Sequence, residues 1–147
     1  MSITRKALLP VLLLGSVPWH GYSQTLTASD VAGSYRRVGP ASVVLVLSAR
    51  DGQVQARLDG GGVPANNGSV PADCTVQATG QLQDRQLSAL FQPVETDNVY
   101  YSAAQAKAEM RRLVIAFAAE KAEVKQADTD GYCGFGIDFR GSYRRER

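Results

Sequence analysis

The sequence predicts a mainly β fold: a small antiparallel β-barrel of seven or eight strands, closed or nearly closed, with one short helix or long loop and one disulfide. Three observations predict it. The pentapeptide Gly-Ser-Tyr-Arg-Arg occurs at 33–37 and again at 141–145, near the two ends of the chain. Short segments in which apolar and polar residues alternate lie between the two copies. The chain has two cysteines, Cys74 and Cys133.

Residues 1–23 are expected to be a secretory signal peptide. Two basic residues, an apolar run over 7–17 and the small residues Gly21 and Ser23 form the pattern of such a leader, with cleavage before Gln24. The apolar run is shorter than the roughly 20 residues that cross a membrane. No cysteine stands at the cleavage site to accept a lipid. We therefore expect a periplasmic protein that is neither a lipoprotein nor inserted in a membrane, with 24–147 as a single β-barrel domain.

Loss of the leader changes the composition of the domain. The formal charge falls from +2 to zero, because Arg5 and Lys6 are removed while all 14 acidic residues stay. This balance argues against a nucleic-acid partner. The chain's single histidine, His20, is removed as well. Ser-His-Asp catalysis, Cys-His catalysis and histidine-ligated metal sites are thereby excluded, and no cofactor is expected.

The two cysteines are interpreted as a disulfide, because exported proteins meet an oxidising compartment. Cys74 and Cys133 lie 59 positions apart. A link across a loop of this length is worth about 4 kcal/mol in the chain-entropy treatment. The alternative, a reactive thiol, needs a nearby base or basic pocket that the sequence does not show.

The first half of the domain is predicted to contain four strands with hairpin turns. Asp51-Gly52 is a residue pair suited to a tight turn, and a second turn is expected near Gln83–Arg85. Glycine, proline and asparagine between Gly60 and Cys74 indicate a mobile surface loop. The strands are expected, from their period of two, at 42–49, 54–59, 74–79 and 87–92.

The second half is harder to assign. Residues 102–110 contain strong helix formers with Ser102 as a possible cap, but alternation reappears further on. We expect a short helix or irregular loop near 102–110 and strands near 112–119 and 122–127. Phe135, Ile137 and Phe139 also alternate, which predicts a last strand that continues into the second Gly-Ser-Tyr.

The repeated pentapeptides are predicted to pair as neighbouring strands that close the barrel. Gly33 and Gly141 would allow a bend or a close approach, and Tyr35 and Tyr143 would pack at the closure. The arginines would then face outward, as a solvated surface or as a grip for the carboxylates of a partner. These arginines are Arg36, Arg37, Arg144 and Arg145.

Candidate partner-binding residues lie in the central loops. Tyr100 and Tyr101 stand close to Asp97, and Tyr132 adjoins the second cysteine. Tyrosines on loops are frequent contact residues at protein–protein interfaces. An alternative interpretation, equally open at this point, is that these tyrosines line the mouth of the barrel.

No residue pattern predicts an enzyme. A glycosidase needs two paired carboxylates, and nothing marks any two of the acidic residues as such a pair. The segment 128–131 resembles a fragment of a calcium loop, but Gln126 and Ile137 stand where further ligands would be required. A turn is the preferred interpretation, and no metal site is expected.

The segment 131–143, in which Cys133-Gly134-Phe135 leads into Gly141-Ser142-Tyr143, resembles a pattern in small exported bacterial proteins. The chain is similar in this respect to periplasmic lysozyme inhibitors and to immunity proteins against secreted cell-wall hydrolases. Inhibitors of that type carry a Ser-Gly-x-Tyr or Ser-Gly-x-x-Tyr loop, and this chain has neither form. No inhibitory residue is therefore transferred from them.

The resemblance implies a non-enzymatic periplasmic binding protein. Its expected partner is a cell-wall hydrolase, either a lysozyme-type glycosidase or a secreted amidase effector, which it would inhibit or against which it would give immunity. Two alternatives stay open: a barrel that carries a small apolar ligand, and a structural protein of the envelope. The sequence does not indicate the oligomeric state.

Overall fold

The structure, a computed structural model, describes residues 25–63, 66 and 73–147. The predicted leader at 1–23 and part of the predicted loop between Gly60 and Cys74 lie outside the described residues. No helix in the described part is long and apolar enough to span a membrane.

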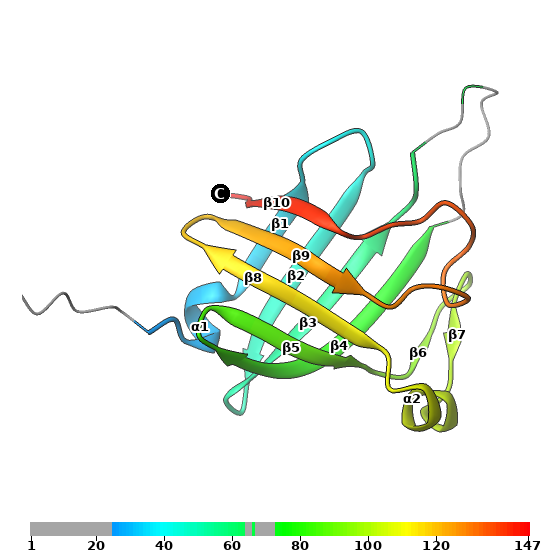
Figure 1. Cartoon of the computed structure of the whole chain (residues 1–147), viewed down its shortest axis with the longest axis horizontal. Coiled ribbons are helices and arrows are strands. Elements are labelled where there is room, and N and C mark those ends of the chain that lie inside the picture. Colours follow the sequence, from blue (N-terminus) through cyan, green and yellow to red (C-terminus); the bar gives the residue numbers. More distant parts are fainter. Residues whose placement is uncertain (1–24, 64–65, 67–72) are drawn as a thin grey trace, which may run out of the picture.

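Eight antiparallel strands form a closed barrel, as predicted (Figure 1). Around the barrel they follow the order β1-β10-β9-β8-β5-β4-β3-β2. A separate two-stranded hairpin and two short helices complete the fold. The barrel strands are β1 Gly33–Arg37, β2 Val43–Arg50, β3 Gln53–Gly60, β4 Cys74–Gln83, β5 Gln86–Phe91, β8 Arg112–Ala118, β9 Lys121–Ala127 and β10 Gly141–Arg145. The other elements are α1 Ala28–Val31, β6 Val94–Glu95, β7 Tyr100–Tyr101 and α2 Ala103–Glu109.

Alternation of apolar and polar residues builds the barrel wall. In β3 and β5 every second side chain is buried and the others are exposed, because successive side chains of a strand point to opposite faces. The inward side chains fill the barrel with a single apolar core. Its largest fully buried members are Tyr35, Tyr143, Phe139, Leu45, Leu58, Leu87, Leu113 and Ile115.

Two of the tight turns match their prediction. Asp51 and Gly52 join β2 to β3 with φ angles of 51° and 75°. Asp84 and Arg85 join β4 to β5 with φ angles of 47° and 63°. Positive φ at both central residues is the geometry whose twist fits that of a two-residue hairpin.

The ambiguous stretch at 102–127 contains one short helix and two strands, as expected. Ser102 caps α2, with its hydroxyl accepting the Gln105 N–H while the Gln105 side chain accepts the Ser102 N–H. The helix ends at Met110, which has a left-handed conformation with φ of 45°. Strands β8 and β9 then follow as a hairpin.

The prediction of a strand through Phe135, Ile137 and Phe139 is wrong. Residues 128–140 form turns and irregular structure, and β10 begins only at Gly141. Gly131 and Gly136 take φ angles of 68° and 85°, which are incompatible with an extended strand. Of the three apolar residues, Phe139 alone is fully buried, while Phe135 lies entirely in solvent.

The two Gly-Ser-Tyr-Arg-Arg copies pair with each other and close the barrel, as predicted. We call the paired strands β1 and β10 the seam. Tyr35 lies opposite Arg145, Arg36 opposite Arg144, and Arg37 opposite Tyr143. Identical sequences paired antiparallel in this register are related by a local two-fold axis through the central arginine pair. The tyrosine hydrogen bond and one arginine–carbonyl hydrogen bond of one half recur in the other.

Each seam tyrosine is buried and donates its hydroxyl to a carbonyl four residues earlier. Tyr35 donates to Val31 over 2.9 Å, and Tyr143 donates to Phe139 over 2.7 Å. Both rings are at most 1% exposed. Burial raises the pKa of the Tyr143 hydroxyl, although the nearby Arg37 opposes the shift. The hydroxyl therefore stays protonated and donates, so that this buried polar atom has a hydrogen-bond partner.

The expectation that all four seam arginines face outward is wrong for Arg37 and Arg145. Each lies two residues after its tyrosine and therefore on the same side of its strand. The Arg145 guanidinium lies 5.3 Å from the Tyr35 ring centroid and donates to the carbonyls of Asp30 and Ala32 over 2.6 and 2.9 Å. By the local two-fold, Arg37 donates to the carbonyl of Asp138.

The backbone conformation favours glycine at the two positions that these arginines cross. Gly33 and Gly141 have φ angles of 148° and 134°, which side-chain-bearing residues rarely adopt. Arg145 lies across Gly33 and Arg37 across Gly141, at 3.6 and 3.5 Å from where a Cβ would stand. With the carbonyl partners included, the repeat covers eight residues, Asp-x-x-Gly-Ser-Tyr-Arg-Arg, at 30–37 and 138–145. The predicted close approach is thus made by arginine side chains.

Removal of one seam tyrosine should unfold the barrel more easily. Tyr143→Ala is expected to lower the free energy of unfolding by about 3–5 kcal/mol, since it leaves a cavity in a filled core. Tyr143→Phe should cost only about 1 kcal/mol, the net worth of one hydrogen bond. Denaturant unfolding measures both, with the exposed Arg144→Ala as the matched control. A Tyr143→Ala protein as stable as the parent would contradict the role of the seam.

A second constraint on the barrel is Gly80 in β4. A Cβ at this position would overlap the backbone carbonyl oxygen of Ser88 and stand 2.5 Å from the Cα of Ala89, both in β5. Neither backbone atom can rotate away. Glycine in a strand interior therefore marks the corner at which β4 bends against β5.

Gly80→Ala should accordingly be destabilising by about 3 kcal/mol, the upper part of the range for overpacked sites. Gly134→Ala is the matched control, because nothing lies within 4 Å of its added Cβ and its φ is not in the positive range. Thermal unfolding of the two variants decides the point. Equal melting temperatures would show that the strand bend does not depend on glycine.

Candidate functional site

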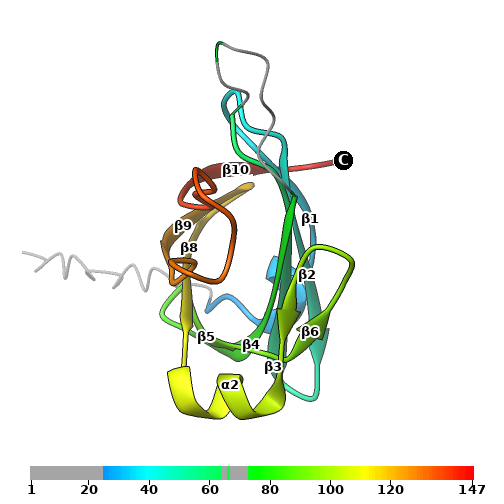
Figure 2. The same ribbon diagram turned by 90° about the vertical axis from the view of Figure 1, so that its right-hand side faces the viewer.

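The long connections of the barrel are gathered at one end. Three tight hairpin turns, between β2 and β3, β4 and β5, and β8 and β9, lie at the opposite end together with α1. We call the end with the long connections the loop end; Figure 2 looks onto it. It carries residues 38–42, the described residues between β3 and β4 (61–63, 66 and 73), residues 92–111 and residues 128–140. Loops placed on a rigid scaffold are where binding residues are commonly found.

The β6–β7 hairpin projects from the loop end. Its turn closes with a hydrogen bond of 2.8 Å from the Thr96 N–H to the Val99 carbonyl, and one of 3.0 Å from the Val99 N–H to the Thr96 hydroxyl. Asp97 lies exposed in this turn. Tyr100 and Tyr101 point to opposite faces of β7, so that one ring is 70% exposed and the other 3%.

Tyr101 belongs to an aromatic cluster beneath the loop end. Its ring packs edge-on against Tyr132 at 5.0 Å, and Tyr132 packs in the same way against Phe91 at 5.2 Å. The Tyr132 hydroxyl donates to the Thr75 carbonyl over 2.9 Å. Burial raises the pKa of both tyrosine hydroxyls. The buried Tyr101 hydroxyl has no hydrogen-bond partner among the described residues.

Arg111 joins this cluster to the 128–140 segment. Its guanidinium lies 5.8 Å from the centroid of the Tyr132 ring and donates over 2.7 Å to the carbonyls of Asp128 and Asp130. An ion pair with Glu109 at the end of α2 holds the guanidinium from the other side. One arginine thus ties together α2, the aromatic cluster and the turn before the second cysteine.

The predicted disulfide is confirmed. Cys74 at the start of β4 bonds Cys133 in the 128–140 segment, with an S–S distance of 2.00 Å. The link fastens this segment to the barrel wall on the side away from β10. The sulfurs lie next to the aromatic cluster, since Tyr132 precedes Cys133 and Thr75 follows Cys74. The disulfide and the aromatic cluster therefore hold the loop end in place on the barrel.

The predicted partner-binding residues divide into two groups. Tyr100 and Asp97 lie on the surface of the hairpin and stay candidates for partner contact. Tyr101 and Tyr132 lie together in the aromatic cluster, where Tyr101 is buried and Tyr132 half-buried. These two fit the alternative interpretation, in which tyrosines line the mouth of the barrel.

Sequence reasoning missed other exposed apolar side chains at this end. Seven large apolar side chains are exposed in the described part, and five of them lie at the loop end. The signal for one was present: Phe135 stands between Gly134 and Gly136, a pattern typical of a loop, but its spacing was interpreted as strand alternation. The five are Val38, Val63, Tyr100, Met110 and Phe135.

Acidic side chains are also exposed at the loop end. Glu95, Asp97 and Asp130 are exposed and form no ion pair with another described residue. Asp138 is instead paired with Arg140, whose hydrogen bonds lower the pKa of the Asp138 carboxyl. The loop end thus presents apolar anchors with a partly uncompensated negative rim.

The segment 128–131 forms a turn, in which the Asp128 carboxylate accepts from the Arg112 N–H and from the Gln126 amide, both over 2.8 Å. No group of three potential metal-ligating side chains stands close together in the described ranges.

Comparisons with protein-family models, with curated proteins and with solved structures gave no match to this chain. The fold and the site define the class to which it belongs: small closed antiparallel β-barrels, stapled by one disulfide, with their long loops at one end.

Proposed function

We propose that the protein is a non-enzymatic, exported binding module that inhibits, or gives immunity against, a peptidoglycan-degrading enzyme, and that the loop end is its contact surface. One observation carries the proposal: long connections and exposed apolar side chains are concentrated at one end of a rigid, filled barrel. Aromatic anchors with a polar rim are the usual composition of a binding surface for a protein.

The titratable groups support binding over catalysis. A carboxyl group that serves as a general acid needs a raised pKa. The Asp and Glu side chains with shifted pKa values in the described part, namely Asp30, Asp59, Asp138 and Glu146, are all shifted downward. Hydrogen bonds from neighbouring side chains lower each of these pKa values. At Asp59 they outweigh burial, which by itself would raise the pKa. Such carboxylates act as structural hydrogen-bond acceptors.

The filled interior supports a surface contact over internal ligand carriage. The inward side chains of all eight strands belong to one buried cluster. Hollows of 280 to 560 Å³ lie on the outer face of the barrel or at its two ends. A small apolar ligand in the barrel would have to displace core side chains, which costs stability.

The charge of the loop end suits the proposed type of partner. An enzyme that degrades an anionic wall polymer gains from a positively charged cleft, because the cleft attracts its substrate. Glu95 and Asp97 project on the hairpin that also carries Tyr100. Their charge would steer this hairpin toward such a cleft and accelerate association. The disulfide is compatible with the expected export to an oxidising compartment.

The test is inhibition of purified cell-wall hydrolases, glycosidases and amidases, in a cell-wall turbidity assay with the full domain. At least one enzyme should be inhibited at stoichiometric concentration. Tyr100→Ala combined with Phe135→Ala should weaken its binding by about 30- to 1,000-fold, the loss of two anchors worth about 1–2 kcal/mol each. Calorimetric titration measures the Kd, which should rise with salt because charges assist the contact.

Val46→Ala combined with Leu90→Ala is the matched control, since these are the two large exposed apolar residues that the described part of the chain has outside the loop end. Their replacement should leave inhibition unchanged. The proposal fails if no hydrolase is inhibited, or if the loop-end variant inhibits as strongly as the parent while keeping its fold.

A further inference from the structure

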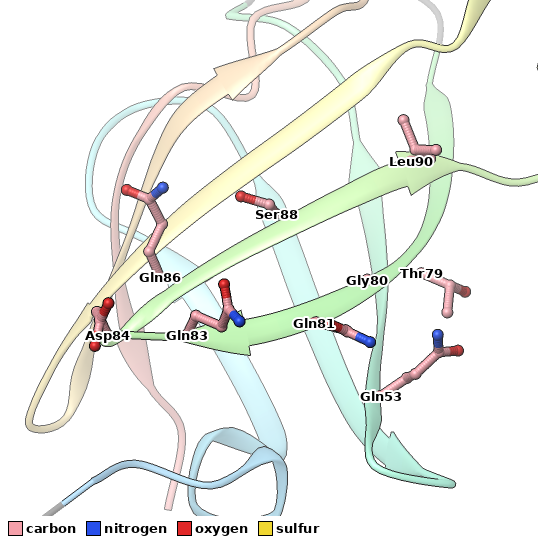
Figure 3. A pocket seen from close by; sticks show the side chains of 9 residues that line it. All are labelled: Gln53, Thr79, Gly80, Gln81, Gln83, Asp84, Gln86, Ser88 and Leu90. Atoms are coloured by element: carbon pink, nitrogen blue, oxygen red, sulfur yellow. The ribbon is translucent and has the colours of Figure 1, made fainter.

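The outer face of β3, β4 and β5 carries a hollow of about 560 Å³. Figure 3 shows its side chains arranged along β4 and β5, with Gln53 at the start of β3 at one side. The hollow lies on the barrel wall, apart from the loop end. Its lining residues are Gln53, Thr79, Gly80, Gln81, Gln83, Asp84, Gln86, Ser88 and Leu90.

Side-chain amides dominate this hollow. Strand pairing places Gln81 opposite Ser88, Gln83 opposite Gln86, and Thr79 opposite Leu90. Paired side chains stand on one face at about 5 Å, and successive pairs on that face follow at roughly 7 Å. The result is a regular array of amide and hydroxyl groups, fixed by the bend of β4 at Gly80.

The amides in the array are available to a ligand. No hydrogen bond among the described residues uses the side chain of Gln53, Gln81, Gln83 or Gln86. The glutamine side chains that do form such bonds lie elsewhere: Gln92, Gln105 and Gln126. A glutamine amide offers two donors and one acceptor. Four of them around one hollow can both donate to and accept from the same ligand.

The chemistry of the lining selects a neutral, polar ligand. Asp84 is the single charged residue that lines the hollow, and Leu90 the single large apolar one. An ionic ligand would find no cluster of opposite charge, and an apolar ligand would leave the amides without partners. A peptide strand cannot add here by main-chain pairing, because a closed barrel has no free edge.

A protein surface is a poor occupant too, because the hollow offers none of the aromatic or arginine anchors that dominate protein interfaces. Hydroxyl and acetamido groups both donate and accept hydrogen bonds, so each of them can pair with one side-chain amide of the array. Both kinds of group occur on every unit of a glycan of N-acetylated sugars.

We propose that the glutamine-lined hollow on β3–β5 binds a neutral glycan chain of N-acetylhexosamine units. Binding is weak at one site, in the millimolar range, since the ligand stays largely in solvent and flexible glutamine side chains lose freedom on contact. The site is separate from the loop end, and its existence does not depend on the proposed function. It would hold the protein on a glycan surface while the loop end contacts a partner.

The experiment is titration of the isotope-labelled domain with N-acetylglucosamine hexamer, followed by NMR. The side-chain amide signals of Gln53, Gln81, Gln83 and Gln86 should shift with a common millimolar Kd. Maltohexaose, which has hydroxyl but no acetamido groups, should bind at least threefold more weakly. Gln81→Glu combined with Gln86→Glu should weaken hexamer binding at least tenfold, while Gln105→Glu combined with Gln126→Glu should not.

Absence of shifts at 10 mM hexamer, roughly tenfold above the expected Kd, would overturn the proposal. Equal binding by both glutamate variants would do the same. Shifts of these amides with protein concentration alone would also overturn it, because the face would then be covered by a second copy of the chain. The Tyr100→Ala, Phe135→Ala variant should keep its glycan affinity, so failure of this site and failure of the proposed inhibition are distinguishable.

Discussion

The clasp between the two copies of Asp-x-x-Gly-Ser-Tyr-Arg-Arg is the interaction on which the rest of this structure depends. Each copy supplies a buried tyrosine, and each sends an arginine across the glycine of the other to reach backbone carbonyls. An antiparallel sheet of eight strands that did not close would expose two edges and one face of its core. The tyrosine hydrogen bond, the arginine–glycine contact and one arginine–carbonyl hydrogen bond occur in both halves, so one short sequence closes the barrel, and the Tyr35 and Arg145 contacts also position α1.

The same clasp supports the loop end from a distance. Arg37 and Tyr143 donate to the carbonyls of Asp138 and Phe139, which lie near the end of the 128–140 segment, shortly before β10. The disulfide fixes the middle of that segment, and Arg111 fixes its beginning. Three attachments therefore hold a segment without regular secondary structure. Phe135 lies between the disulfide and the seam contacts of Asp138 and Phe139. Its side chain is exposed, and its backbone is anchored on both sides. Such an arrangement lowers the entropic cost of binding a partner.

Sequence reasoning predicted what depends on local pattern. Alternation and turn chemistry gave β2 to β5 and the Asp51-Gly52 hairpin, and the identity of the two pentapeptides gave the closure. The failures have physical causes. Three apolar residues at every second position suggested a strand at 135–139, but Gly136, with a φ of 85°, turns the chain there. Arg37 and Arg145 were expected in solvent because of their charge, whereas strand geometry places them beside the tyrosines. The sequence analysis did not predict the glutamine array, since only strand register brings Gln81, Gln83 and Gln86 to one hollow.

The most direct test of the central role of the seam is native-state hydrogen exchange. The amides of Arg36 and Arg144, at the centre of the seam, should exchange only through global unfolding, with the same free energy as amides of Leu58 and Val76 in the β3–β4 pair. Their exchange should respond to denaturant with the full m-value of the domain. Exchange of the seam amides at a clearly lower free energy, with β3 and β4 still protected, would show that the barrel opens between β1 and β10 and would contradict the account.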